Sequence, residues 1–259
     1  MGAPLRIEWH GEVAVWTLDR PEAKNALDWA TFAALGRAIA EAADNPRLRA
    51  VILTGAGGAF ASGGDLRELR SALGAEDAGR LAEAGRGVCD GLAELAVPVV
   101  AALPGPAIGG GAELAMACDL RIADPAATLC FKHARMGVTT AWGILPKLVV
   151  VVGHATASRL LLTGQTLGAQ EGLRVGVFDA IAEEGGCVAA ALGWAGDVAR
   201  GAPGAVRELK AMLREATAGS PELRASERRR FVASWTSDDH REAVQAYFAG
   251  RGPTWSRGG

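Results

Sequence analysis

The feature of this 259-residue sequence that most constrains its fold is a design that occurs twice: an apolar run, a glycine-rich loop and a helix start. The first copy is VILTGAGGAFASGGDL (51–66) and the second is VVAALPGPAIGGGAEL (99–114). A short apolar run closed by glycine is typical of a buried strand, and glycine lets the backbone approach a ligand closely. The sequence therefore predicts two strand–loop–helix units, each with unpaired amides where its helix begins.

The surrounding sequence alternates strand and helix signals in the same way. We expect further strands and helices at 13–18, 29–45, about 79–95, 120–123 and 128–131. From about residue 141 onward, alanine-rich amphipathic segments predict a mostly helical chain. Alternating elements followed by helices indicate an α/β fold, with a core over residues 1–195 and a helical region over 196–259 that serves trimerisation or acts as a lid.

Composition and charge argue against several classes of partner. The chain has 27 Lys and Arg against 29 Asp and Glu, so its net charge of −2 gives no electrostatic basis for binding nucleic acid or an acidic membrane. The arginine-rich segment 224–230 is typical of a solvated helix face or an oligomer contact. The longest apolar stretch is broken by three prolines, and the N-terminus lacks a secretory signal. We expect a soluble, cytoplasmic protein.

The cysteines show no pairing pattern. There are four of them, far apart and without a CxxC pair: Cys89, Cys118, Cys130 and Cys187. This spacing favours reduced, mostly buried thiols over a disulfide framework or a zinc site. We expect no bound metal and no redox cofactor.

The two glycine loops favour one kind of chemistry. Amides from two loops brought together can converge on an oxygen that becomes negatively charged, which is an oxyanion hole. A dinucleotide fingerprint would need glycine or alanine at Phe60, and a phosphate loop would need Gly-Lys-Ser/Thr. A nucleophilic Ser62 would need glycine two positions earlier. A structural role of the glycines, as tight turns, stays open.

Glu113 lies three residues beyond Gly110, in the first turn of the helix that follows the second loop. A carboxylate at that position is favoured by the helix dipole, so a structural role is one interpretation. Beside two converging amides, the same carboxylate becomes the candidate acid/base group.

Three segments, in this order and spacing, closely resemble the crotonase (enoyl-CoA hydratase/isomerase) superfamily: LDRPEAKNAL (18–27), AFASGGDL (59–66) and GGGAELAMACDLRIA (109–123). A fourth, at 160–179, is similar to a segment further along these enzymes. The resemblance covers roughly residues 5–250. It implies a ClpP-like spiral of ββα units with a helical C-terminal region, and homotrimers or dimers of trimers. It also implies acyl-CoA thioesters as substrates in acyl-CoA or fatty acid metabolism, with coenzyme A part of the substrate rather than a cofactor.

Carried over by position, the resemblance implies roles for individual residues. The amides of Ser62 and Gly110 would form the oxyanion hole, and Glu113 would be the acid/base group. The coenzyme A moiety would lie against a set of residues from the N-terminal loop and the first glycine loop: Lys24, Ala26, Ala61, Gly63, Asp65 and Leu66. Asp65 is equally suited to cap a helix, and Lys24 to be an ordinary surface cation.

The stretch FKHARMGVTTAWG (131–143) departs from the hydratase pattern. Hydratases use two glutamates to add water across a double bond, and the first corresponds to Glu113. An ungapped alignment through the flanking glycines puts His133 in the place of the second, with Lys132 where a proline belongs. We therefore do not expect ordinary two-carboxylate hydration, and an isomerase of this family would lose its second base for the same reason.

The same stretch is similar to the ethylmalonyl-CoA decarboxylase branch of the superfamily. Loss of CO2 from a 2-alkylmalonyl-CoA forms a thioester enolate, which an oxyanion hole stabilises without an activated water. Glu113 would protonate the α-carbon, His133 would orient the leaving carboxylate, and Trp142 would form an apolar wall. A structural histidine and a core tryptophan are the alternatives for the last two.

The sequence therefore favours an acyl-CoA lyase that decarboxylates a short 2-alkylmalonyl-CoA. Three alternatives stay open. One is an enoyl-CoA hydratase/isomerase that relies on Glu113, and another is a thioester hydrolase. The third is a catalytically silent protein that binds coenzyme A.

Overall fold

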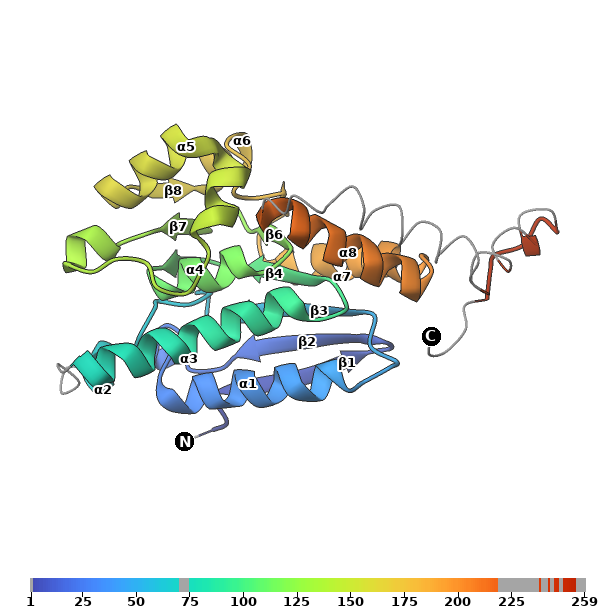
Figure 1. Ribbon diagram of the computed structural model, residues 1–259, viewed down its shortest axis with the longest axis horizontal. Helices are drawn as coiled ribbons and strands as arrows, with labels where there is room; N and C mark the ends of the chain where they lie inside the picture. Colours follow the sequence, from blue (N-terminus) through green and yellow to red (C-terminus); the bar gives the residue numbers. More distant parts are fainter. Residues whose placement is uncertain are drawn as a thin grey trace.

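The computed structural model describes residues 2–69 and 75–218, with 238, 242, 245, 246 and 249–254 near the C-terminus. Its centre is a six-stranded sheet with the strand order β1-β2-β3-β4-β6-β9 (Figure 1). The strands are β1 (Leu5–His10), β2 (Val13–Leu18), β3 (Ala50–Gly55), β4 (Val99–Leu103), β6 (Leu120–Ala123) and β9 (Ala180–Ile181). β1 and β2 form an antiparallel hairpin, and the later pairings in this sheet are parallel.

Both faces of the parallel strands are covered, which is why these strands are almost continuously apolar. Along β3, Val51 and Leu53 join the larger of two apolar cores, whereas Ala50 and Ile52 join the smaller one on the opposite face. The larger core packs under helices on one side of the sheet (Figure 1), namely α1 (Trp29–Ala43), α3 (Ala75–Glu94) and α4 (Gly110–Ala117). The smaller core packs against α7 (Cys187–Ala199).

A second, smaller sheet brings the glycine run next to the stretch 131–143. It consists of β5 (Ala107–Ile108), β7 (Thr128–Cys130) and β8 (Thr166–Gly168). β5 runs parallel to β7 and leads into α4, while β7 leads into the 3-10 turn η2 (His133–Met136). Because β5 and β7 are paired, the chain segments that follow them start side by side.

The remaining helices are η1 (Pro21–Ala23), α2 (Leu66–Leu69), α5 (Leu145–Thr163), α6 (Ala169–Arg174) and α8 (Pro203–Ala218). By length and composition, α5 is apolar enough to cross a membrane. Gly153 interrupts it, however, with the non-helical angles φ 75° and ψ 158°. Each half is therefore shorter than the roughly 20 residues that a membrane-spanning helix needs.

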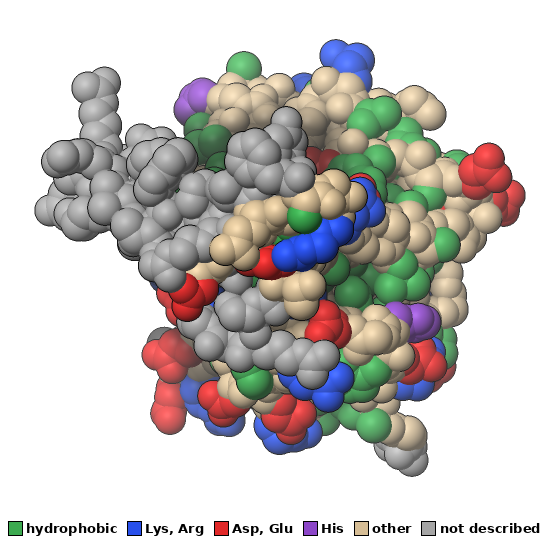
Figure 2. Space-filling view, turned by 90° about the vertical axis from the view of Figure 1, so that its right-hand side faces the viewer, with side chains coloured by type: hydrophobic (Ala, Val, Ile, Leu, Met, Phe, Trp, Pro, Cys, Tyr) green, Lys and Arg blue, Asp and Glu red, His purple; other side chains and the backbone are tan. Residues whose placement is uncertain are grey.

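Charged side chains of both signs are interspersed on the molecular surface. On the face seen in Figure 2, acidic and basic side chains lie side by side along the lower edge, with hydrophobic side chains between them. This distribution agrees with the net charge of −2. The four cysteines are all buried and unpaired, as the sequence predicts, and burial raises the pKa of Cys118 and Cys187 to about 12.

The principal elements agree with those predicted from the sequence, and the strands at 13–18 and 120–123 have the predicted bounds. The prediction missed the hairpin partner β1 and the short strands β5, β8 and β9. The basic segment 224–230 lies outside the described residues, as do residues 219–237 as a whole and several later positions of the region 196–259. The trimer and the cytoplasmic location stay predictions.

Candidate active site

The second glycine loop enters α4 through Gly109, which has φ 57° and ψ −120°. A side chain rarely tolerates this conformation, so glycine is required here. The amide of Gly109 donates a hydrogen bond of 2.8 Å to the carbonyl of Cys130, which anchors the loop to β7. Gly110 is the first helical residue, and its amide has no acceptor within the helix or elsewhere in the described chain. The structure therefore presents the unused amide of Gly110 at the positive end of α4.

The first glycine loop meets the second one backbone to backbone. Gly63 has φ +93°, and a Cβ on it would lie 2.9 Å from the carbonyl oxygen of Ile108 and 3.2 Å from the amide nitrogen of Gly110. The carbonyl of Ala61 also accepts a 2.9 Å hydrogen bond from the amide of Ile108. The structure thus brings together the two loops, as the repeated design in the sequence predicts.

Ser62 is held by the N-terminal loop. Its amide donates to the carbonyl of Lys24 at 3.1 Å, and its hydroxyl donates to the carbonyl of Ala23 at 3.2 Å. A thioester oxygen would have to share the Ser62 amide with the Lys24 carbonyl or displace it. The pairing of the Ser62 and Gly110 amides in an oxyanion hole therefore stays a prediction.

Glu113 is buried in the first turn of α4, with 1% of its surface exposed. Its Oε1 lies 3.0 Å from Nε2 of His133, and its Oε2 accepts a 3.0 Å hydrogen bond from the amide of Trp142. A buried carboxylate needs such partners, because leaving water without them is costly. Both oxygens are thereby held in place one turn from Gly110.

His133 lies beside Glu113, at the position where the family alignment of the stretch 131–143 places it. Its side chain is 12% exposed, and its ring stacks on Phe131 with the ring centres 6.4 Å apart. Nε2 contacts Glu113, while Nδ1 is buried and has no hydrogen-bond partner. A ring nitrogen of histidine can donate or accept a hydrogen bond, so Nδ1 keeps an unused hydrogen-bonding capacity. An unpaired buried polar atom of this kind is uncommon and marks the ring as available to a further group.

Trp142 covers the start of α4. Its indole packs edge-on against Phe32, with ring centres 5.6 Å apart and an interplanar angle of 87°. The ring also lies so close to Gly110 and Gly85 that a Cβ on either glycine would overlap it. Trp142 is 6% exposed, so it both packs in the core and forms a wall of the site. Its backbone amide is a partner of Glu113 that the sequence does not reveal.

Asp65 is a structural cap. Its carboxylate accepts hydrogen bonds from the guanidinium of Arg20 at 2.9 Å and from the amide of Arg67 at 3.0 Å. Burial alone would raise the pKa of Asp65, but these hydrogen bonds outweigh it and hold the pKa below its ordinary value. Arg20 also donates to the carbonyl of Ala26 and pairs with Asp28. Arg20 stands inside the motif at 18–27, but its spacing alone does not predict this role.

The other residues predicted to bind coenzyme A lie along one seam between the N-terminal loop and the first glycine loop. The amide of Leu27 donates to the carbonyl of Gly63, and the carbonyl of Leu27 accepts from the amide of Asp65. Lys24 is exposed, Ala26 is buried beside it, and Ala61 is fully buried. Leu66 begins α2. Their roles in binding stay predictions.

No group of three or more His, Cys, Asp and Glu side chains in the described part of the chain is placed to hold a metal ion.

Comparison with known proteins gives one consistent result. The family model described as enoyl-CoA hydratase/isomerase matches residues 8–258. The chain is 33% identical over 247 residues to a short-chain-enoyl-CoA hydratase of Clostridium acetobutylicum, with 95% of this chain and 94% of that protein covered. It is 34% identical over 263 residues to a carnitinyl-CoA dehydratase of Salmonella arizonae, with 98% and 99% covered.

Solved structures agree with the sequence relatives. An enoyl-CoA hydratase from Bacillus anthracis superimposes with a TM-score of 0.94 at 27% identity, over 98% of this chain and all of that chain (100%). A putative enoyl-CoA hydratase from Streptomyces coelicolor A3(2) gives a TM-score of 0.92 at 34% identity, over 98% and 94%. The chain therefore belongs to the enoyl-CoA hydratase/isomerase family of the crotonase superfamily, and it has the crotonase fold.

Proposed function

We propose that this enzyme adds water to a 2-enoyl-CoA, and removes it from the corresponding 3-hydroxyacyl-CoA, using Glu113 and His133 as a proton-exchanging pair. The observation that carries the proposal is the buried 3.0 Å contact between Glu113 Oε1 and His133 Nε2. The relatives support it, because the hydratase and the dehydratase reported above are named for the addition or removal of water. Decarboxylation, which the sequence analysis favoured, has no counterpart in those names.

The amide of Gly110 supplies the electrostatic part of the reaction. Attack of water on the β-carbon shifts negative charge onto the thioester oxygen, and an enolate forms. An unused amide at the positive end of α4 stabilises that oxygen more strongly as its charge grows. The Ser62 amide would be the second donor after it exchanges the Lys24 carbonyl for the substrate oxygen.

Proton transfer falls to the Glu113–His133 pair. With both ring nitrogens protonated, as an imidazolium, and with the carboxylate ionised, the pair contains both an acid and a base. The carboxylate takes a proton from the attacking water, and the imidazolium gives a proton to the α-carbon. Transfer across the 3.0 Å contact then restores the starting state. In sum, one water is added and nothing else is consumed.

The test incubates the purified protein with crotonyl-CoA and, separately, with ethylmalonyl-CoA, and follows the product masses. We expect a gain of one water on crotonyl-CoA and no loss of CO2 from ethylmalonyl-CoA. Glu113→Gln should lower the hydration rate at least ~100-fold, the usual range for a lost general acid/base. Loss of CO2 from ethylmalonyl-CoA without hydration of crotonyl-CoA would refute the proposal and restore the decarboxylase.

A further inference from the structure

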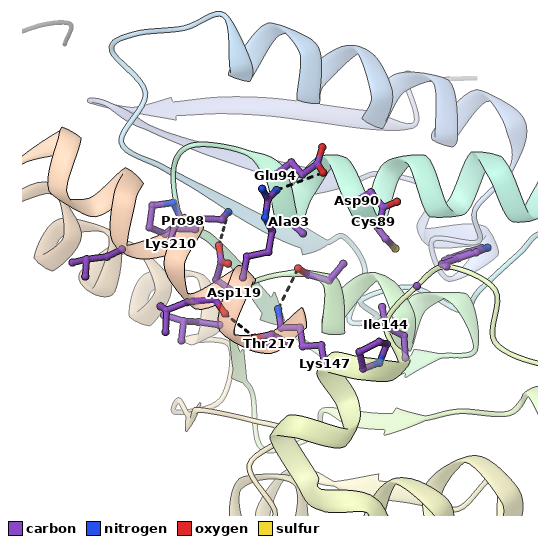
Figure 3. A pocket seen from close by; sticks show the side chains of 18 of the residues that line it. Cys89, Asp90, Ala93, Glu94, Pro98, Asp119, Ile144, Lys147, Lys210 and Thr217 are labelled. Atoms are coloured by element: carbon purple, nitrogen blue, oxygen red, sulfur yellow. Dashed lines mark hydrogen bonds and ion pairs between the residues drawn. The ribbon is translucent and has the colours of Figure 1, made fainter. Parts of the chain in front are cut away.

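A cavity of about 740 Å³ lies between α3, α4, the start of α5, α7 and α8 (Figure 3). Its volume is in the range of sites that enclose small organic molecules. Figure 3 shows Cys89 and Ile144 at one end of the cavity and the ion pair of Asp119 and Lys210 at the other. Most of the wall between these ends is apolar, with contributions from Val198, Val206, Leu209 and Leu213.

One face of α3 leads from the active site into this cavity. Gly85, Cys89 and Ala93 follow one another at intervals of four residues, so they lie on the same side of the helix. Gly85 packs under the Trp142 ring, whereas Cys89 and Ala93 line the cavity. The helix surface that supports the indole therefore continues directly as a wall of the cavity.

Helix α4, which carries the Glu113 carboxylate, also leads from the active site to the cavity. Glu113 and Ala117 are four residues apart on α4, and Ala117 lines the cavity. At 1.5 Å per residue, the two positions are about 6 Å apart along the helix axis. The cavity thus begins one helical turn from the proposed reaction centre.

Trp142 stands between the two spaces. Its side chain lines the cavity and also lies against Gly110, whose amide is the proposed donor to the thioester oxygen. We propose that the Trp142 indole is the partition that restricts this enzyme to short acyl chains, and that the cavity behind it admits an aliphatic chain once the indole is removed. The inference rests on the proposed function and adds to it a determinant of chain length.

The charged groups at the far end of the cavity are matched with one another. Lys210 pairs with Asp119 at 2.7 Å, and Arg214 pairs with Glu94 at 3.5 Å. Lys147 donates to the carbonyls that end α4, at 2.5 Å from the oxygen of Cys118. With Asp119, Glu94, Lys210 and Arg214 already paired and Lys147 bound to backbone carbonyls, the mostly apolar remainder of the lining favours a hydrocarbon chain.

The test measures binding rather than turnover, so that it does not depend on the reaction. Butyryl-CoA and octanoyl-CoA, which are saturated and cannot be hydrated, are titrated calorimetrically into the wild type and Trp142→Ala. Each buried methylene tightens binding roughly fourfold, and the two thioesters differ by four. We expect no preference for octanoyl-CoA in the wild type and a preference on the order of 100-fold in the variant.

Further variants make the result specific. Trp9→Ala removes an exposed tryptophan, 53% accessible on β1, and should leave the ratio of the two affinities unchanged. Ala93→Phe, added to Trp142→Ala, refills the cavity and should abolish the gain. Trp142→Leu, a smaller truncation, serves if Trp142→Ala does not fold, and should give a smaller gain in the same direction.

Two results would overturn the inference. One is a wild type that already prefers octanoyl-CoA tenfold or more. The other is an unchanged affinity ratio in folded Trp142 variants that still bind butyryl-CoA. Failure of the proposed function shows up separately, as absence of crotonyl-CoA hydration while the thioesters still bind. If no thioester binds to the wild type or to any variant, both proposals fall.

Discussion

Replacing Gly110 by alanine should destabilise the protein through one contact, that with the Trp142 ring. An added Cβ would overlap the indole carbons, and Gly110 is helical with no positive φ, so the backbone itself would accept alanine. Alanine in a helix is otherwise more favourable than glycine by up to about 1 kcal/mol. Overpacking a tightly filled site costs about 1–3 kcal/mol. We therefore expect a net loss of roughly 0–2 kcal/mol in the free energy of unfolding.

A double-mutant cycle tests this reasoning. Equilibrium urea denaturation is measured for the wild type, Gly110→Ala, Trp142→Ala and the double variant. Without the indole, Gly110→Ala should become neutral or slightly stabilising, because the clash is gone and only the helix preference is left. Gly85→Ala, whose Cβ meets the same ring from α3, should behave in the same way. If Gly110→Ala is equally destabilising with and without Trp142, the indole does not lie against Gly110.

Three further predictions follow from the site and its surroundings. His133→Glu, which rebuilds two carboxylates, should keep more crotonyl-CoA hydration than His133→Gln in steady-state kinetics; equal loss would contradict it. Burial lowers the pKa of Lys147 to about 8. Its charged form therefore destabilises the folded state at lower pH. The free energy of unfolding should rise between about pH 8 and 10.5 by up to about 3 kcal/mol. Lys147→Met should flatten this rise in urea denaturation, and an unchanged slope would refute it. The lowered pKa of Asp65 contributes stability that is present above pH about 4 and is lost as pH falls further; Arg20→Ala should weaken this acid dependence, and an acid titration by circular dichroism would show whether it does.

Much of the fold was predictable because the strands of the large sheet carry their signal locally. The run at 50–55 begins with four apolar residues and is buried throughout, since both faces of β3 are covered. β5 and β9 contain only two residues each, too few for any periodicity, and they exist as strands because of the partners the fold gives them. The break at Gly153, with φ 75° and ψ 158°, is likewise not signalled by the continuous apolar run around it.

The candidate site was predictable where it depends on sequence neighbours. Gly110 and Glu113 share one helical turn, so their proximity follows from their spacing. The contact of His133 with Glu113 was expected only through the family resemblance. The hydrogen bond between Arg20 and Asp65 spans 45 positions, and the wall of the cavity joins α3 to the far α8. Such long-range contacts come from tertiary packing, and the local sequence does not predict them.

The central claim is that Glu113 and His133 act as one unit in hydration. Its most direct test compares kcat for crotonyl-CoA hydration in the wild type, Glu113→Gln, His133→Gln and the variant with both changes. Residues that act as a unit give strongly non-additive losses. Each single change should therefore lower kcat nearly as much as the two together. A His133→Gln enzyme with nearly full activity, or losses that simply multiply, would contradict it.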